Sequence, residues 1–254
     1  MALQYASEGA QLLLVARRKS ILESSANECR SLNSHSKCHI VTGDVALEST
    51  LAEVSAAARN LLGGCDILVL CAGLTSILPF EKLCSKDKDE PGFLDSVMRN
   101  VFNVNVFSNL LAVKHLLPLL KEDKGTILAI SSAAGFMPAP TRAIYVASKH
   151  AVNGFFNSLR IEVQKYGVSV VLACPGTIDT DFRISALDHT DESVQQKLSK
   201  GIKPDKCARI VIRGADEKRR EIHIPSYYKI AVILSFLFPS FIDRMAATKY
   251  NYQM

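Results

Sequence analysis

Two residues four positions apart, Tyr145 and Lys149, have side chains that could act together in proton transfer. They fall within a helical pattern of apolar residues, so they share one face of the expected helix. A free tyrosine has a pKa of about 10, which is too high for efficient proton donation at neutral pH. An ammonium group one turn away stabilises the phenolate and lowers that pKa. The pair therefore indicates proton donation to a developing alkoxide, although the same spacing is also common on exposed helix faces.

A serine and a glycine-containing segment stand where they could join this pair. Ser132 lies thirteen residues before Tyr145, just after an apolar strand. Ligands of an open α/β sheet bind beyond the carboxyl ends of its strands, so this hydroxyl would hold a substrate carbonyl beside the tyrosine. The alternative is a serine that caps the following turn. The next strand ends at the same edge in Pro175-Gly-Thr-Ile-Asp-Thr180, where Gly176 lets backbone approach a ligand.

The elements that must position these residues follow an alternating order. Short apolar runs alternate with longer helical patterns, which is typical of a parallel sheet covered by helices on both faces. A chain of 254 residues with no repeat and no linker fits one doubly wound α/β domain, 1–254. The predicted strands are 11–16, 39–42, 66–71, 126–130, 168–173 and 221–225, and the predicted helices include one ending near 32, 48–62, a long helix through 105 to about 120, and 145–166.

Three stretches do not fit the alternation. Residues 82–91 are polar and predict a loop, and 181–203 are polar and poorly periodic, which indicates a substrate lid. The segment 227–254 contains the most apolar run, 230–238, but Pro239 interrupts it well short of the ~20 residues that span a bilayer. This segment predicts either a helix packed on the protein or contact with a membrane surface.

The composition excludes several classes of partner and site. Lys plus Arg exceed Asp plus Glu by only 30 − 25 = 5, and the basic residues are scattered, which argues against a nucleic-acid partner. The seven cysteines show no C-x-x-C spacing and no accompanying histidine cluster. We therefore expect no metal site and no disulfide framework, but reduced, mostly buried thiols in a reducing, cytosol-facing environment.

Taken together, these motifs resemble the short-chain dehydrogenase/reductase family and its Rossmann-like fold. The resemblance rests on Asp44, Cys71-Ala-Gly73, Asn105, Ser131-Ser-Ala-Ala-Gly135, Tyr145-Val-Ala-Ser-Lys149 and Pro175-Gly-Thr-Ile-Asp-Thr180. Within the family the chain most resembles the membrane-associated reductases related to 11β-hydroxysteroid dehydrogenase, including the dehydrogenase/reductase member 7 group. Its tail, Ile224-Pro-Ser-Tyr-Tyr228 before the apolar run, fits that group loosely.

The resemblance implies a role for each of four residues. Tyr145 is the general acid/base, and Lys149 lowers its pKa and holds the nicotinamide ribose. Ser132 orients the substrate carbonyl. Asn105, rather than Asn103, lies forty residues before Tyr145 and helps a water chain relay protons to Lys149. The alternative for Asn105 is a polar residue on a solvated helix face.

The resemblance also implies a cofactor. In such folds an acid after the strand 11–16 binds the ribose 2′-hydroxyl of NAD, whereas an arginine accommodates the 2′-phosphate of NADP. This chain has Arg17 and Arg18 there and no acid, which favours NADP(H), unless both are ordinary surface charges. Asp44 would accept a bond from the adenine amino group. The remaining implied cofactor contacts are Val45, Cys71, Ala72, Gly73, Tyr145, Lys149, Pro175, Gly176, Ile178 and Thr180.

The implied activity is NADP(H)-dependent hydride transfer to or from a carbonyl or secondary alcohol on a hydrophobic substrate that is steroid-, retinoid- or lipid-like. A homodimer formed by the helices of Asn105 and Tyr145 is also implied. The expected location is either the cytoplasm or a cytosol-facing membrane surface such as that of the endoplasmic reticulum.

The chain departs from the family pattern at two places. The family begins with a strand and a Gly-x-x-x-Gly-x-Gly turn, whereas this chain begins inside the helix that follows. We therefore expect an N-terminally incomplete chain, with unpaired strand edges at 11–16 and 66–71. The alternative is a catalytically silent interaction protein of the same fold, because the phosphate-binding loop is missing. Cys71 stands where the family usually has Asn.

Overall fold

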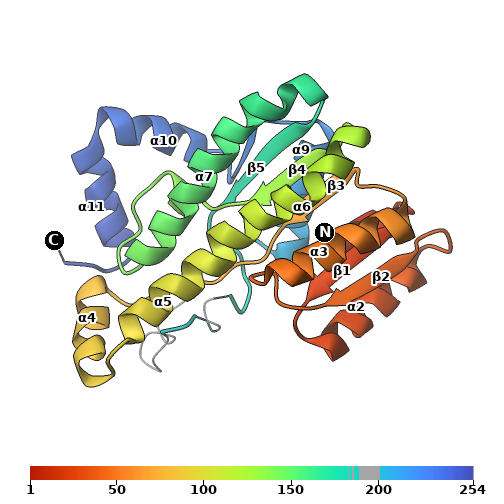
Figure 1. The fold of residues 1–254 in the computed structure, drawn as a ribbon. Coiled ribbons are helices and arrows are strands. Elements are labelled where there is room, and N and C mark those ends of the chain that lie inside the picture. The colour runs from red at the N-terminus through yellow and green to blue at the C-terminus, as the bar shows by residue number, and fades with distance from the viewer. Residues whose placement is uncertain (183, 185, 189–200, 254) are drawn as a thin grey trace.

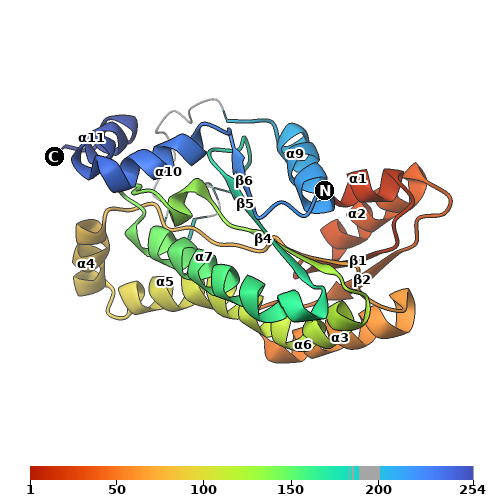
Figure 2. The same cartoon turned by 90° about the horizontal axis from the view of Figure 1, so that it is seen from above.

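The computed structural model describes residues 1–182, 184, 186–188 and 201–253, and its strands form two parallel sheets (Figure 1). One sheet has the order β1-β2 and the other has the order β3-β4-β5-β6. Helices cover both faces, with α3, α6 and α7 on one side and α1, α2 and α9 on the other (Figure 2). This arrangement confirms the predicted α/β fold with a parallel, helix-covered sheet.

All six predicted strands are present, with ends that differ by one or two residues. They are β1 (Leu12–Ala16), β2 (Cys38–Thr42), β3 (Ile67–Leu70), β4 (Thr126–Ile130), β5 (Ser169–Pro175) and β6 (Glu221–Ile224). Strands β4 and β5 are almost wholly buried, as expected of central parallel strands. Every residue of β1 and three of the four in β3 are only half-buried. Within the described residues, β1 and β3 share no ladder of hydrogen bonds.

The main core lies between the sheet and the helices of one face. These helices are α3 (Glu48–Ala57), α5 (Phe93–Phe102), α6 (Ser108–Glu122) and α7 (Ala143–Val163). Leu116, Ile127 and Phe156 are among the fully buried side chains that join α6, β4 and α7. The opposite face carries α1 (Ala2–Ser7), α2 (Lys19–Leu32) and α9 (Pro204–Asp216). Because both faces of the central strands are covered, loops at the strand ends are the places where ligands can reach backbone.

The predicted loop at 82–91 is wrong, because most of it is helical. Helix α4 (Phe80–Asp89) buries Leu83 in a cluster with Leu78, Val97 and Ile144. The other side chains of this helix are mostly polar and face solvent. A helix that buries one strongly apolar residue gives no clear 3.6-residue pattern, and this is why composition indicated a loop.

The long helix predicted through 105 is interrupted. Residues Asn103–Phe107 form a π-helical segment between α5 and α6. Such π-helical turns are rare and occur often at functional sites. The interruption lies at Asn105, one of the predicted site residues.

The C-terminal segment folds as two helices, α10 (Tyr228–Leu237) and α11 (Pro239–Lys249). Pro239 occupies the first turn of α11, where its missing N–H has no partner to lose. None of the helices in the described ranges is long and apolar enough to cross a membrane. Of the predicted lid 181–203, residues 183, 185 and 189–200 lie outside the described residues.

Candidate active site

Helix α7 presents Tyr145 and Lys149 on one buried face, as the four-residue spacing predicts. Their residues are 7% and 4% exposed. The Lys149 Nζ donates a hydrogen bond of 3.0 Å to the carbonyl oxygen of Ile130, the last residue of β4. The same nitrogen lies 5.8 Å from the centre of the Tyr145 ring. The pair therefore stands at the carboxyl end of a central strand.

Burial sets the acidity of the Lys149 ammonium. Removal from water lowers its pKa to about 8, since a charged group is disfavoured where water is excluded. In the part of the chain that the structure describes, this ammonium makes one hydrogen bond and no ion pair with a carboxylate. An ammonium has three donors, so two remain for the hydroxyl groups of a ligand. The donor set fits the ribose of a nicotinamide cofactor.

The Tyr145 phenol is subject to opposing effects. Its pKa is raised above the ordinary value, because burial outweighs the hydrogen bond with the Ser132 hydroxyl and the positive charge of Arg142, which both lower it. The structure thus identifies two groups that make this phenol more acidic. That Lys149 does so as well stays a prediction.

Ser132 caps the following turn, and its other predicted function, holding a substrate carbonyl, stays a prediction. Its Oγ accepts a hydrogen bond of 3.1 Å from the backbone N–H of Ala134, so it caps the short turn that follows β4. It also hydrogen-bonds with the phenol of Tyr145. The cap fixes the hydroxyl in place beside the phenol, which is the position needed to hold a substrate carbonyl.

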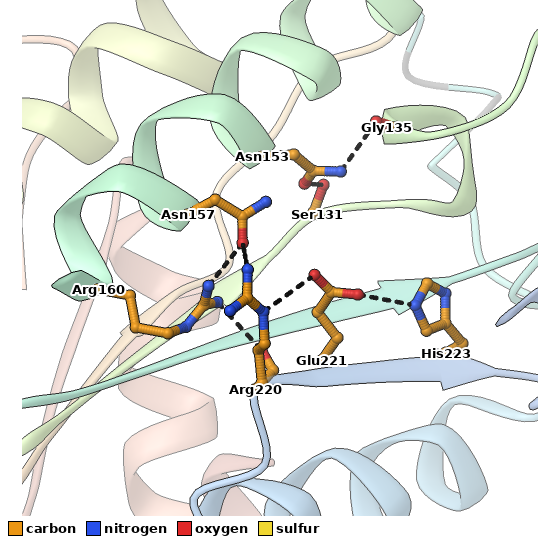
Figure 3. A network of polar contacts seen from close by, with 8 residues as sticks. All are labelled: Ser131, Gly135, Asn153, Asn157, Arg160, Arg220, Glu221 and His223. Carbon is orange, nitrogen blue, oxygen red and sulfur yellow. Dashed lines mark hydrogen bonds and ion pairs between the residues drawn. The ribbon is translucent and has the colours of Figure 1, made fainter. Parts of the chain in front are cut away.

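Asn153 is a site residue that the sequence interpretation missed. It lies on α7, four residues after Lys149, and its side chain holds the turn that carries Ser132 (Figure 3). Its Oδ1 accepts from Ser131 Oγ at 2.6 Å, and its Nδ2 donates to the Gly135 carbonyl at 2.9 Å. A Cβ on Gly135 would lie only 2.4 Å from that amide nitrogen. The sequence did contain a signal for Asn153, because Tyr145, Lys149 and Asn153 follow one another at intervals of four residues and so share one face of α7.

A second group of polar residues holds α7 to the edge strand β6 (Figure 3). Asn157 Oδ1 accepts from Arg160 Nη1 at 2.6 Å, and Arg160 Nη2 donates to the Arg220 carbonyl at 3.1 Å. Glu221 on β6 contacts His223 at 3.2 Å. These contacts fix the position of α7 from its far end and leave Tyr145 itself untouched.

Asn105 is fully buried, which excludes the alternative of a solvated helix face. Its Oδ1 accepts from the Leu74 N–H at 2.7 Å, and its Nδ2 donates to the Leu74 carbonyl and to Ser148 Oγ, both at 2.9 Å. Asn103 is exposed, in agreement with the choice of Asn105. The amide thus ties the loop after β3 to the helix of Tyr145. Its role in a water chain stays a prediction.

Two of the predicted cofactor residues lie together at the ends of β1 and β2. Arg17 Nη1 is 3.8 Å from Asp44 Oδ2, and the Asp44 Oδ1 accepts from the N–H of Ala46 at 2.9 Å. Arg17 and Arg18 are exposed, and Arg18 is the N-cap residue of α2. An exposed guanidinium beside a fixed carboxylate can bind a phosphate on one side and an amino group on the other. Val45 is half-buried.

The loop after β3 borders the site. Cys71 and Ala72 are exposed, and the position of a Cβ on Gly73 would lie 3.4 Å from Asn105 Oδ1. The loop after β3 therefore lies next to the buried side-chain amide of Asn105, with Cys71 and Ala72 exposed to solvent.

The loop after β5 differs in part from its interpretation. A Cβ on Gly176 would lie 2.6 Å from the ring of Tyr228, so this glycine permits the close approach of α10. Its N–H donates to the Ile224 carbonyl at 2.7 Å, and Pro175 is the last residue of β5. Ile178 forms a bridge with Ile202, and the Thr180 N–H donates to the Ile178 carbonyl at 3.0 Å. Contact of this loop with a cofactor stays a prediction.

No group of three or more histidine, cysteine or acidic residues that could hold a metal ion occurs among the described residues.

Comparison with known proteins yields a consistent set of relatives. Residues 1–191 match the family described as short chain dehydrogenase. The chain is 32% identical to a hydroxysteroid 11-beta-dehydrogenase 1-like protein of Gallus gallus, over 99% of this chain and 82% of that protein. It is 30% identical to an 11-beta-hydroxysteroid dehydrogenase-like protein of Arabidopsis thaliana, over 96% and 74% of the two chains.

A solved structure has the same fold. An alcohol dehydrogenase from the archaeon Thermococcus sibiricus, complexed with 5-hydroxy-NADP, superposes with a TM-score of 0.71 at 24% identity. The match covers 87% of this chain and 89% of that one.

Proposed function

The chain belongs to the short-chain dehydrogenase family, and from this premise we propose that it is a nicotinamide-dependent oxidoreductase that interconverts a carbonyl and a secondary alcohol on a hydrophobic substrate. The observation that carries the proposal is the buried Tyr145 phenol, hydrogen-bonded to Ser132 and one helical turn from the Lys149 ammonium. When bound, the nicotinamide supplies or accepts the hydride.

The proton that the substrate oxygen receives comes from a side chain of the protein, the Tyr145 phenol. The hydroxyls of Ser132 and Tyr145 both donate to the substrate oxygen, and the phenol gives up its proton as that oxygen becomes an alkoxide. The positive charge of Arg142 stabilises the resulting phenolate. The Lys149 ammonium, fixed by Ile130, holds the ribose hydroxyls with its two remaining donors.

Arg17 supports NADP(H) as the preferred cofactor. Its guanidinium is exposed at the end of β1, where Arg17 Nη1 lies 3.8 Å from Asp44 Oδ2. Because this contact is long and exposed to solvent, the guanidinium keeps donors for a phosphate. A 2′-phosphate in this position would receive charge-assisted hydrogen bonds from the arginine. The archaeal enzyme of the same fold was solved with a derivative of NADP, which agrees with this choice.

The substrate class follows from the relatives and from the tail. Relatives that share about 30% of their residues carry names of hydroxysteroid dehydrogenases, which supports a steroid- or lipid-like carbonyl. On α10 and α11, seven large apolar side chains are each more than half exposed: Ile230, Ile233, Phe236, Leu237, Phe238, Phe241 and Met245. These two helices lie at the end of the molecule opposite β1 and β2 (Figure 1).

We extend the proposal to contact of this apolar surface with the cytosolic face of a membrane. Phe236 is 81% exposed, and the exposed cations Lys229 and Arg244 flank the surface. Exposed apolar patches of this kind mark interaction sites, and nearby cations favour anionic lipids. Sedimentation with vesicles of anionic or neutral lipid tests the proposal. Phe236→Glu should abolish binding, whereas Phe80→Glu, on another exposed phenylalanine, should leave it intact.

A homodimer formed by α6 and α7 remains part of the proposal. Phe107 and Ile161, next to or on these helices, are 51% and 73% exposed. Light scattering of the wild type and of Ile161→Glu tests it, since a charge in a two-fold interface should give monomers.

One experiment tests the oxidoreductase proposal. The protein translated from its complete transcript, with whatever residues that transcript encodes before Met1, is titrated with NADPH by calorimetry and then assayed for NADPH oxidation with steroid ketones, retinal and long-chain ketones. Binding with turnover of at least one of these carbonyls is expected. A chain that binds no NADPH and oxidises none in their presence would instead be a catalytically silent protein of this fold.

A further inference from the structure

A buried carboxylate joins the loop after β3 to the segment after β5. Asp188 is 1% exposed. Its oxygens accept hydrogen bonds from Ser76 Oγ at 2.7 Å and from the N–H groups of Ile77 and Leu78 at 2.8 and 3.0 Å. The neighbouring Leu187 N–H donates to the Thr75 carbonyl at 3.2 Å. These contacts join parts of the chain more than one hundred residues apart.

The same loop is held from its other side by the predicted catalytic residue Asn105. The Asn105 amide makes two hydrogen bonds with the backbone of Leu74, two residues before Ser76. The loop is thus fixed between Asn105, which also contacts the helix of Tyr145, and Asp188, which belongs to the segment after β5. A displacement of the segment after β5 would therefore also displace the loop after β3.

Six residues before Asp188, the ring of Phe182 lies between this loop and Tyr145. Its centre is 6.1 Å from that of the Tyr145 ring, with the two planes inclined at 61°. Two of its ring atoms lie 3.8 and 3.9 Å from the position of a Cβ on Gly73. The Phe182 ring therefore lies beside the phenol that a substrate carbonyl would have to reach.

We propose that Phe182 is a specificity-determining residue that forms the apolar wall of the substrate site, and that Asp188 is a positioning residue that holds it there. The ring favours substrates with a flat, apolar surface next to the carbonyl and limits the bulk that fits beside Gly73. Asp188 acts at a distance, because it touches neither Tyr145 nor a bound carbonyl. The inference on specificity rests on the proposed oxidoreductase function.

The position of Phe182 can be tested without any catalysis. Tyrosines are labelled with carbon-13, and the ring signal of Tyr145 is assigned by its loss in Tyr145→Phe. Phe182→Leu removes the aromatic ring current and should shift this signal. Asp188→Ala and the isosteric Asp188→Asn should move it in the same direction, and should have little further effect when combined with Phe182→Leu.

Hydrogen exchange shows whether the carboxylate contacts are lost. In Asp188→Ala the amides of Ile77 and Leu78 should exchange at least about tenfold faster, since both acceptor oxygens are removed, and in Asp188→Asn at least one of the two should do so, since one oxygen is replaced by an NH2 group. Asp87→Asn is the matched control, because Asp87 also accepts a backbone N–H, that of Leu94 at 2.9 Å, away from the site. It should leave both the Tyr145 signal and these amides unchanged.

Kinetics test the specificity itself. Phe182→Ala should raise kcat/KM for a bulky, non-planar ketone relative to a flat ring ketone by about tenfold, the usual effect of reshaping an apolar pocket. Asp188→Asn should shift the same ratio in the same direction, and it should not do so in the Phe182→Ala background. A Tyr145 signal unchanged in the Asp188 variants, despite faster exchange at Ile77 and Leu78, would overturn the positioning role. If the ratio of the two kcat/KM values were unchanged in Phe182→Ala, Phe182 would not form a wall of the substrate site. A wild type without turnover would contradict only the proposed function.

Discussion

The Lys149 ammonium donates a hydrogen bond of 3.0 Å to the carbonyl of Ile130, the one protein acceptor it has among the described residues, and so lies fixed at the end of β4. This contact places a buried positive charge beside Tyr145 without a carboxylate partner in the described structure. A buried cation without a counter-ion is costly to the folded state. A bound ribose would offset this cost, because its hydroxyl groups would accept hydrogen bonds from the two remaining donors of the Lys149 ammonium.

Replacing this lysine should therefore stabilise the protein while removing its activity. A pKa lowered from 10.5 to about 8 corresponds to a penalty of about 3 kcal/mol at neutral pH. Lys149→Met removes that penalty and loses one hydrogen bond worth about 1 kcal/mol. Urea unfolding at pH 7 should show a gain of about 2 kcal/mol in the free energy of unfolding. Lys206→Met, at an exposed position on α9, should change it by less than about 0.5 kcal/mol. A clear loss of stability in Lys149→Met would contradict the assignment.

The pH dependence of this gain has a definite sign. Between pH 8 and 10.5 the unfolded chain keeps the Lys149 proton while the folded chain has lost it, so the lysine's penalty shrinks as the pH rises. The stability advantage of Lys149→Met over the wild type should accordingly fall between pH 7 and pH 10. The comparison must be between these two proteins, because burial also raises the pKa of Cys65 and Cys174 to about 12. Those thiols act in the opposite direction; the effect of Cys65 cancels in the difference, whereas Cys174 interacts with the charge of Lys149 and cancels only in part. An advantage that grows with pH would have the wrong sign for a lowered pKa.

Asn153 should matter for turnover although it does not touch the substrate. Asn153→Ala removes the bonds to Ser131 and Gly135 that hold the Ser132 turn. Loss of a positioned hydroxyl should lower kcat/KM about tenfold or more. Asn157→Ala is the control, since Asn157 lies one turn further along α7 and bonds Arg160 instead (Figure 3). Equal losses of activity in the two variants would show that general loosening of α7, rather than the Ser132 turn, is responsible.

Arg17 should decide between the two nicotinamide cofactors. Arg17→Ala should weaken NADPH binding by at least about tenfold, because a charge-assisted bond to phosphate is lost, and leave NADH binding unchanged. Arg99→Ala serves as the control, because Arg99 is exposed and pairs with Asp95 within α5. Titration calorimetry with both cofactors gives the two affinities. If Arg17→Ala weakened the binding of NADPH and NADH equally, Arg17 would not be a residue that binds the 2′-phosphate.

The sequence predicted the strands and the Tyr145–Lys149 pair for the same physical reason, a short and regular spacing, whereas Ser132 was singled out by its place after an apolar strand and Asn105 only by the family resemblance. Buried parallel strands such as β4 and β5 appear as continuous apolar runs. Tyr145 and Lys149 share a helix face because they are four residues apart. Both patterns can be read locally, without knowledge of the tertiary structure.

The missed features depend on contacts between distant parts of the chain. Asp188 bonds residues about 110 positions earlier, and no local pattern indicates such a pairing. Helix α4 was missed because its one buried contact, Leu83, gives no periodicity. Gly176 was interpreted as a ligand-contacting glycine, but the space it leaves is filled by Tyr228, which only the packing of α10 reveals.

The central claim is that the Tyr145 phenol is the proton donor, and its removal tests that claim most directly. Tyr145→Phe keeps the ring and its packing while removing only the hydroxyl. NADPH oxidation is measured with the best carbonyl substrate of the wild type, and NADPH affinity is measured in parallel to confirm an intact cofactor site. We expect kcat to fall at least about 100-fold with NADPH affinity unchanged. A variant that turns over at the wild-type rate would contradict the mechanism.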